Sequence, residues 1–87
     1  MYSESVMVKN KTGLHARPAS IFVQAATKFK SDISVRKGDN TVSSKSIVSL
    51  LSLQINCESV ITISADGIDE KEAVTTLVEL VDKNFSE

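Results

Sequence analysis

The chain has one cysteine, one histidine, one proline and no tryptophan among its 87 residues. A single cysteine, Cys57, excludes an intramolecular disulfide, and we expect it to be a small, partly buried apolar residue. One cysteine and one histidine do not supply the ligands of a structural zinc site. We therefore expect neither a bound metal nor another cofactor.

The sequence also lacks an excess of charge and any long apolar run. Ten basic and eleven acidic residues give a net charge of −1, whereas binding to nucleic acid or to anionic membranes needs a clear basic excess. No apolar run approaches the ~20 residues that span a bilayer, and the segment 2–8 is too short for a signal peptide and carries Glu4. We expect one cytoplasmic domain over residues 1–87.

The most informative segment contains the single histidine and the single proline. Gly13 allows a tight turn, and Pro18 suits the first turn of a helix. His15 is therefore predicted at a helix N-terminus, where backbone N–H groups and the helix dipole favour an anion, with Arg17 two residues on. Phosphate is the natural ligand of such an arrangement. Lone histidines in small domains are also often ordinary surface or core residues, so the residues alone leave the two interpretations about even.

Periodicity predicts the other elements. Alternating apolar and polar residues indicate strands over 4–8, 32–37, 41–43 and 60–65, with a turn at 37–40. Helical spacing indicates amphipathic helices over 16–29 and from about 69 to Phe85, and a short helix from residue 47. Ser46 is a favoured N-cap for the short helix, and Asp69 and Glu72 have capping-box spacing for the last one. The predicted order is β-α-β-β-α-β-α, with the helices on one face of a single sheet.

The string Gly-Leu-His-Ala-Arg-Pro-Ala at 13–19, the segment 45–47 and the order of elements resemble HPr, the histidine-containing phosphocarrier of the bacterial sugar phosphotransferase system. The resemblance runs from Val6 to Phe85. It implies an α+β open-faced β-sandwich, in which a four-stranded antiparallel sheet carries three helices on one face.

The resemblance also implies a function. His15 would accept a phosphoryl group on Nδ1 from enzyme I, which is charged by phosphoenolpyruvate, and pass it to the A component of a sugar-specific enzyme II. Imidazole suits this role because its pKa, near 6.5, leaves it unprotonated and nucleophilic around neutral pH. The Arg17 guanidinium and the Ala16 backbone N–H would stabilise the phosphoryl group. Thr12 is either a contact of this site or an ordinary turn residue. The chain would be a carrier and not an enzyme.

Ser46 has two compatible interpretations. As an N-cap it would contribute about 1 kcal/mol to stability. In Gram-positive relatives a dedicated kinase/phosphorylase modifies the matching serine, and the modified protein is a corepressor for a catabolite-control transcription factor. A phosphate at a helix N-terminus is electrostatically tolerated, so any regulation would act through partner contacts.

Apolar residues of the short helix also have two interpretations, as core or as a docking surface. The family presents part of this helix to its partners, which here implies Ile47, Val48 and Leu51, and of these we expect Ile47 and Val48 to be the exposed ones. Three residues of the first helix would flank them: Ser20, Gln24 and Thr27. We expect a monomer, and we expect the histidine to be exposed because two partners must reach it in turn.

The chain departs from the family at several positions. Ser49, Gln54 and Glu58 stand where glycine is frequent, and Val48 and Leu51 stand where Gram-positive members often have methionine. A side chain at Gln54 costs about 1 kcal/mol if the residue is left-handed. Two other function classes remain open. One is a purely regulatory binding protein, although relatives confined to regulation can lack the histidine. The other is an enzyme, for which the sequence offers little catalytic material.

Overall fold

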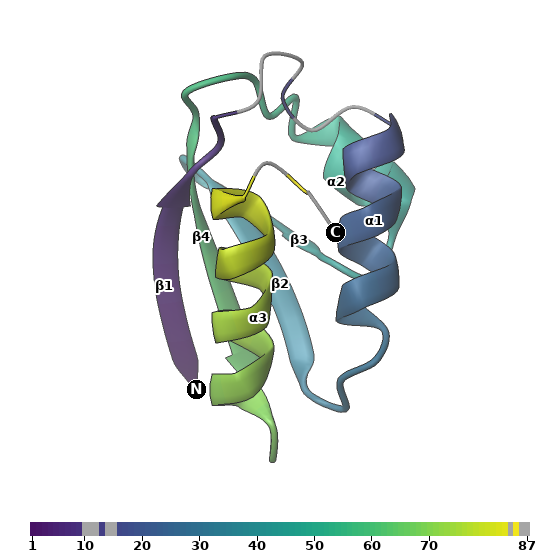
Figure 1. Ribbon diagram of the computed structural model, residues 1–87, viewed down its shortest axis with the longest axis vertical. Helices are drawn as coiled ribbons and strands as arrows, with labels where there is room; N and C mark the ends of the chain where they lie inside the picture. Colours follow the sequence, from purple (N-terminus) through teal and green to yellow (C-terminus); the bar gives the residue numbers. More distant parts are fainter. Residues whose placement is uncertain (10–12, 14–15, 84, 86–87) are drawn as a thin grey trace.

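Strands and helices follow one another in the order that the sequence predicts (Figure 1). The computed structural model describes all residues except 10–12, 14–15, 84 and 86–87. The elements are β1 (Tyr2–Met7), α1 (Ala16–Ala26), β2 (Asp32–Lys37), β3 (Asn40–Ser43), α2 (Ile47–Ser52), β4 (Val60–Asp66) and α3 (Glu70–Asp82).

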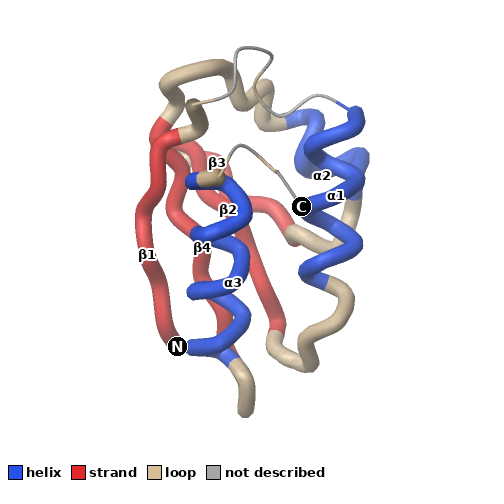
Figure 2. Tube along the Cα trace, viewed as in Figure 1, coloured by secondary structure: helices blue, strands red, loops and turns tan. Residues whose placement is uncertain are grey.

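All strand pairs are antiparallel, and the sheet order is β1-β4-β2-β3. Ala65 in β4 lies opposite Tyr2 in β1 and Ile33 in β2, so β4 and β2 are the central strands. The helices lie on one side of the sheet (Figure 2). The predicted open-faced β-sandwich is confirmed.

The core lies between the inner face of the sheet and the apolar stripes of the helices. Alternate strand residues are buried, as the period of two requires. Both long helices bury residues at the predicted helical spacing, whereas α2 buries only Leu50. The buried helix residues are Ala19, Phe22, Val23 and Ala26 in α1 and Ala73, Val74, Leu77 and Val81 in α3.

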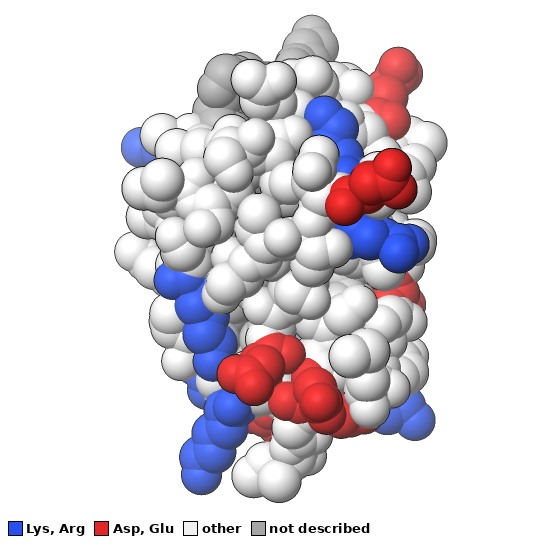
Figure 3. All heavy atoms as spheres, turned by 180° about the vertical axis from the view of Figure 1, so that it is seen from behind, with Lys and Arg blue, Asp and Glu red and all other residues white. Residues whose placement is uncertain are grey.

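The outer face of the sheet carries hydroxyl groups instead of a second apolar layer. Ser3, Ser64, Ser34 and Ser43 lie opposite one another across all four strands. The Ser3 hydroxyl donates to Ser64 Oγ at 2.8 Å. Seen from behind, the molecule has a broad area without charged side chains (Figure 3). Because most of this face is polar, the sheet needs no second covering layer.

Both long helices end earlier than predicted. Helix α1 ends at Ala26, before Phe29, and α3 ends at Asp82. Phe85 is left-handed, with φ of 62°, and its N–H donates to Leu80 O at 2.8 Å. This bond closes the end of α3 as left-handed C-terminal motifs do. Phe85 is therefore buried, as predicted, but by a turn beyond the helix.

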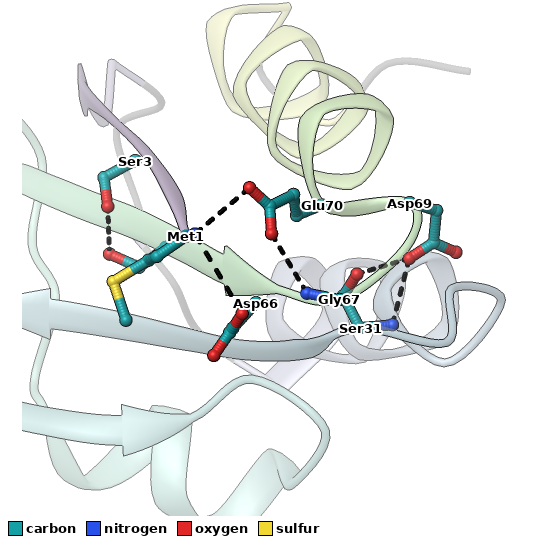
Figure 4. A network of polar contacts seen from close by, with 8 residues as sticks. Met1, Ser3, Ser31, Asp66, Gly67, Asp69 and Glu70 are labelled. Carbon is teal, nitrogen blue, oxygen red and sulfur yellow. Dashed lines mark hydrogen bonds and ion pairs between the residues drawn. The ribbon is translucent and has the colours of Figure 1, made fainter.

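The predicted capping box at the start of α3 is wrong. Asp69 makes no side-chain cap bond, and its carboxylate instead accepts from the Lys30 N–H at 2.8 Å. It also accepts from the Ser31 N–H at 3.0 Å and from the Ser31 hydroxyl (Figure 4). The Glu70 carboxylate accepts from the Gly67 N–H at 3.1 Å. The loop between α1 and β2 is thus tied to the start of α3. A Cβ at Gly67 would lie 2.7 Å from Ser31 Cα, so only glycine fits this approach.

These contacts predict a pH dependence of stability. Donation by the Ser31 hydroxyl and then by the Lys30 N–H lowers the pKa of Asp69. The pKa of Asp69 is therefore lower in the folded than in the unfolded chain. Its contribution to the free energy of unfolding is complete above the usual aspartate pKa of about 4 and is lost as the pH falls through the pKa of the folded state. Asp69→Asn removes the titrating group. We expect its free energy of unfolding, measured in urea from pH 7 to 2, to fall less steeply in acid than that of the wild type.

The matched control is Asp39→Asn in the exposed β2–β3 turn, which should keep the wild-type acid slope. An unchanged slope in Asp69→Asn would contradict the proposed contribution.

Candidate functional site

Helix α1 begins at Ala16, the residue after the single histidine, as predicted. Gly13 has the expected positive φ, 65°. A Cβ on Gly13 would lie 2.4 Å from Ile55 O and 2.8 Å from Asn56 Cα, so this residue must be glycine for the two segments to approach. His15 and Thr12 lie outside the described residues.

Arg17 is exposed in the first turn of α1. The helix carries no other charged residue, so the partial positive charge of its N-terminus is not offset by a carboxylate within the helix. Ala16 is likewise exposed. The start of α1 therefore presents a guanidinium and a positive helix end to solvent, which suits an anion.

An open groove runs along α1 from Arg17. Two predicted docking residues, Ser20 and Gln24, line it together with Ala16, Ile21 and Phe85. Thr27 lies just beyond the end of α1 and is exposed, with its hydroxyl donating to Gln24 O at 2.9 Å. Sequence analysis missed the contribution of Phe85, because helical spacing placed this residue on α3 and not in a turn that reaches α1.

Ser46 is the N-cap of α2, as predicted. Its backbone is extended, with φ of −129° and ψ of 118°, and its Oγ accepts from the Ser49 N–H at 3.3 Å. The carboxyl-terminal neighbours of this cap form an exposed surface. Ile47 is 38% exposed, Val48 78% and Leu51 39%. These three residues are here named the α2 patch. The predicted exposure of Ile47 and Val48 is confirmed, Leu51 is exposed as well, and Leu50 is the residue of α2 that packs in the core.

The segment after α2 contains two left-handed residues, Gln54 with φ of 52° and Glu58 with φ of 69°. Both stand where the sequence analysis noted a missing glycine. Cys57 is exposed, and its Sγ lies 3.5 Å from Lys9 O. The expectation that Cys57 is partly buried is wrong, because Cys57 lies in an exposed turn. The backbone N–H of the next residue, Glu58, donates to Val8 O.

The described residues contain no group of three or more His, Cys, Asp or Glu side chains able to hold a metal ion. Within the same part of the chain, no helix is long and apolar enough to cross a membrane.

Comparisons with known proteins agree on one family. The family model described as "PTS HPr component phosphorylation site" matches residues 2–83. The HPr-like protein Crh of Halalkalibacterium halodurans is 46% identical over 83 residues, covering 95% of this chain and 99% of the relative. Phosphocarrier protein HPr of Neisseria meningitidis is 41% identical over 87 residues, covering 100% and 98%.

A solved structure shows the same fold. The crystal structure of HPr from Thermoanaerobacter tengcongensis superposes with a TM-score of 0.96 at 47% identity, covering 100% of this chain and 98% of the other. The structure of an HPr dimer from the same organism gives a TM-score of 0.79 at 47% identity, with both chains fully covered. The matched region, the identities and the shared sheet and helices show that the chain belongs to the HPr family of the phosphotransferase system, a family of phosphocarrier proteins.

Proposed function

We propose that this chain carries phosphoryl groups between enzyme I and the enzyme IIA domains of a sugar phosphotransferase system, with His15 as the acceptor. The observation that supports this proposal is the start of α1. The helix begins at the residue after His15, has no acidic side chain and exposes Arg17 in its first turn. In the proposed cycle His15 Nδ1 takes the phosphoryl group from the phosphohistidine of enzyme I and then yields it to enzyme IIA.

The local chemistry suits a transient phosphohistidine. The N–H of Ala16 and the guanidinium of Arg17 would donate to the phosphoryl oxygens, and the helix dipole would add to their effect. The groove beside Arg17 is open, so two partners can approach in turn. We assign no small-molecule active site to the chain. It acts as a single domain over residues 1–87, in the cytoplasm, where phosphoenolpyruvate is supplied.

The direct test is phosphorylation by enzyme I. With phosphoenolpyruvate, magnesium and catalytic enzyme I, we expect the intact mass to rise by one acid-labile phosphoryl group, and His15→Ala to take up none. Arg17→Ala should slow the reaction roughly tenfold, because it removes a charge-assisted hydrogen bond. An unlabelled wild-type chain beside a competent enzyme I would refute the carrier function.

We further propose that the α2 patch, with the groove residues Ser20 and Gln24 and with Thr27, forms the docking surface. Apolar side chains that remain exposed on a folded domain often mark an interface. Val48, the most exposed of the three, is 78% exposed, so a partner rather than the core would cover it.

Two exposed valines allow a matched test of this surface. Val48→Glu places a charge in the α2 patch, and Val60→Glu places the same charge on the outer face of the sheet, where Val60 is 56% exposed. We expect Val48→Glu to raise the KM of enzyme I for the carrier about tenfold, with kcat little changed, because a charge buried in an apolar interface is costly. Val60→Glu should match the wild type. Equal KM values for the two variants would place docking elsewhere.

We also propose that an HPr kinase/phosphorylase modifies Ser46, and that the product binds a catabolite-control transcription factor. Support comes from the position of Ser46, which caps α2 and adjoins the α2 patch. A phosphate there would meet the positive end of the helix and leave the fold intact while adding about two negative charges beside the docking surface.

Two substitutions separate the cap from the charge. Ser46→Asp keeps a capping acceptor and adds a charge, so it should retain stability but raise the KM of enzyme I several-fold. Ser46→Ala loses the cap and should lower the free energy of unfolding by about 1 kcal/mol, and its KM should rise less than that of Ser46→Asp because it adds no charge. Urea unfolding and steady-state transfer kinetics measure the two effects. An Asp variant that docks as well as the wild type would argue against regulation by charge.

A regulatory protein without a transport role is the second candidate. It is favoured by the 46% identity to a relative named Crh. The presence of His15 in the sequence favours the carrier. We propose a monomer, because the groove and the α2 patch must be reached by successive partners, although a related HPr forms a dimer in its crystal.

A further inference from the structure

Lys37, the last residue of β2, binds the end of a different element. Its Nζ donates to Gln54 O at 2.6 Å and to Leu53 O at 3.3 Å. Leu53 is the C-cap of α2. The ammonium group therefore lies where the last carbonyls of a helix lack partners within the helix and where the helix dipole is negative.

Gln54, whose carbonyl binds Lys37, also makes the left-handed turn that ends this helix. Gln54 has φ of 52°, a conformation that a residue with a side chain rarely adopts. Its carbonyl is the closer of the two acceptors of Lys37. Beyond it, Ile55 and Asn56 pack against Gly13. Figure 1 shows this segment passing over the end of the sheet, between α2 and β4.

Helix α2 depends on contacts at its ends. It has six residues, too few to be stable alone, and it buries only Leu50. Ser46 caps its first turn, and Lys37 binds the residues that follow its last turn. The α2 patch occupies the three exposed apolar positions between these two ends. The direction in which the patch faces thus depends on both attachments.

We propose that Lys37 is a positioning residue for partner docking. By holding the carbonyls of Leu53 and Gln54, it fixes the orientation of α2 and of the α2 patch. The inference rests on the proposed phosphocarrier function. Without the ammonium group the α2 patch keeps its residues but is held less firmly. A partner must then order the patch when it binds, and the cost of this ordering weakens the binding. The loss falls on association and not on the transfer of the phosphoryl group.

The test uses Lys37→Met, which keeps the length of the side chain and removes its charge. We expect the KM of enzyme I for this variant to rise about three- to tenfold with kcat unchanged, and amide hydrogen exchange at Leu53 and Gln54 to become faster. Lys37→Arg should retain most of the wild-type KM, since it keeps a cation at the same carbonyls. Arg36→Met is the matched control, because it removes one positive charge from the neighbouring, exposed position of β2.

A second variant tests the link to the left-handed turn. Glycine adopts this conformation freely, so Gln54→Gly should reduce the effect of Lys37→Met on KM when the two are combined. A Lys37→Met protein with a lower melting temperature but wild-type KM would make the residue merely structural and overturn the proposal. A fall in kcat at constant KM would overturn it as well.

Hydrogen exchange separates this inference from the proposed function. If enzyme I fails to phosphorylate even the wild type, the carrier function is refuted, and the positioning role is refuted with it. The exchange data would still show whether Lys37 holds the end of α2. If the wild type is phosphorylated and Lys37→Met has the same KM, only the positioning role fails. Should Lys37→Met not fold, Lys37→Gln is judged by the same criteria.

Discussion

The structure depends on a sheet that is apolar on one face only. Alternate positions of β2 and β4 bury Ile33, Val35, Ile61 and Ile63, while most of the opposite positions carry polar side chains. Both amphipathic helices must therefore cover the same face, since each has one apolar stripe to bury. Once α1 and α3 are placed there, the chain order sends the start of α1 and the short α2 to the same part of the molecule, where α1 and α2 pack together. A one-sided core thus brings helix α1 and the helix that Ser46 caps together.

Helix α2 shows how a docking surface can coexist with a small core. A helix that buried its apolar residues fully would gain stability but present nothing to a partner. Here only Leu50 enters the core, and the α2 patch stays in solvent. The helix therefore lacks the stability that burial of the α2 patch would give. The Ser46 cap and the Lys37 ammonium group stabilise it instead, one at each end.

Local patterns could be predicted from the sequence, and contacts between distant segments could not. The stripe of α1 and the Ser46 cap depend on residues a few positions apart, so periodicity and capping preferences locate them. The capping box failed because the Asp69 carboxylate is bound by Ser31, 38 residues earlier in the chain, and no local rule contains that competitor. The predicted extension of the last helix to Phe85 was wrong for a different reason. Its spacing fits a helix, but a left-handed turn buries it instead.

The candidate site divides in the same way. The histidine motif and its helix start are local and were recognised from residues 13–19. Lys37 carried no signal, because its role depends on the pairing of β2 with the rest of the sheet and on the path of the chain after α2.

The contact between Lys37 and Gln54 also bears on the stability of the turn after α2. Glycine would adopt the left-handed conformation of this turn without strain. Glutamine costs about 1 kcal/mol there, which is a noticeable part of the stability of a domain this small. A cation bound to the carbonyl of the strained peptide offsets that cost through a charge-assisted hydrogen bond and through the helix dipole. Lys37 and Gln54 therefore form one unit. Replacing either alone changes the balance at the end of α2, whereas Gln54→Gly together with Lys37→Met removes both the strained conformation and the cation that offsets its cost.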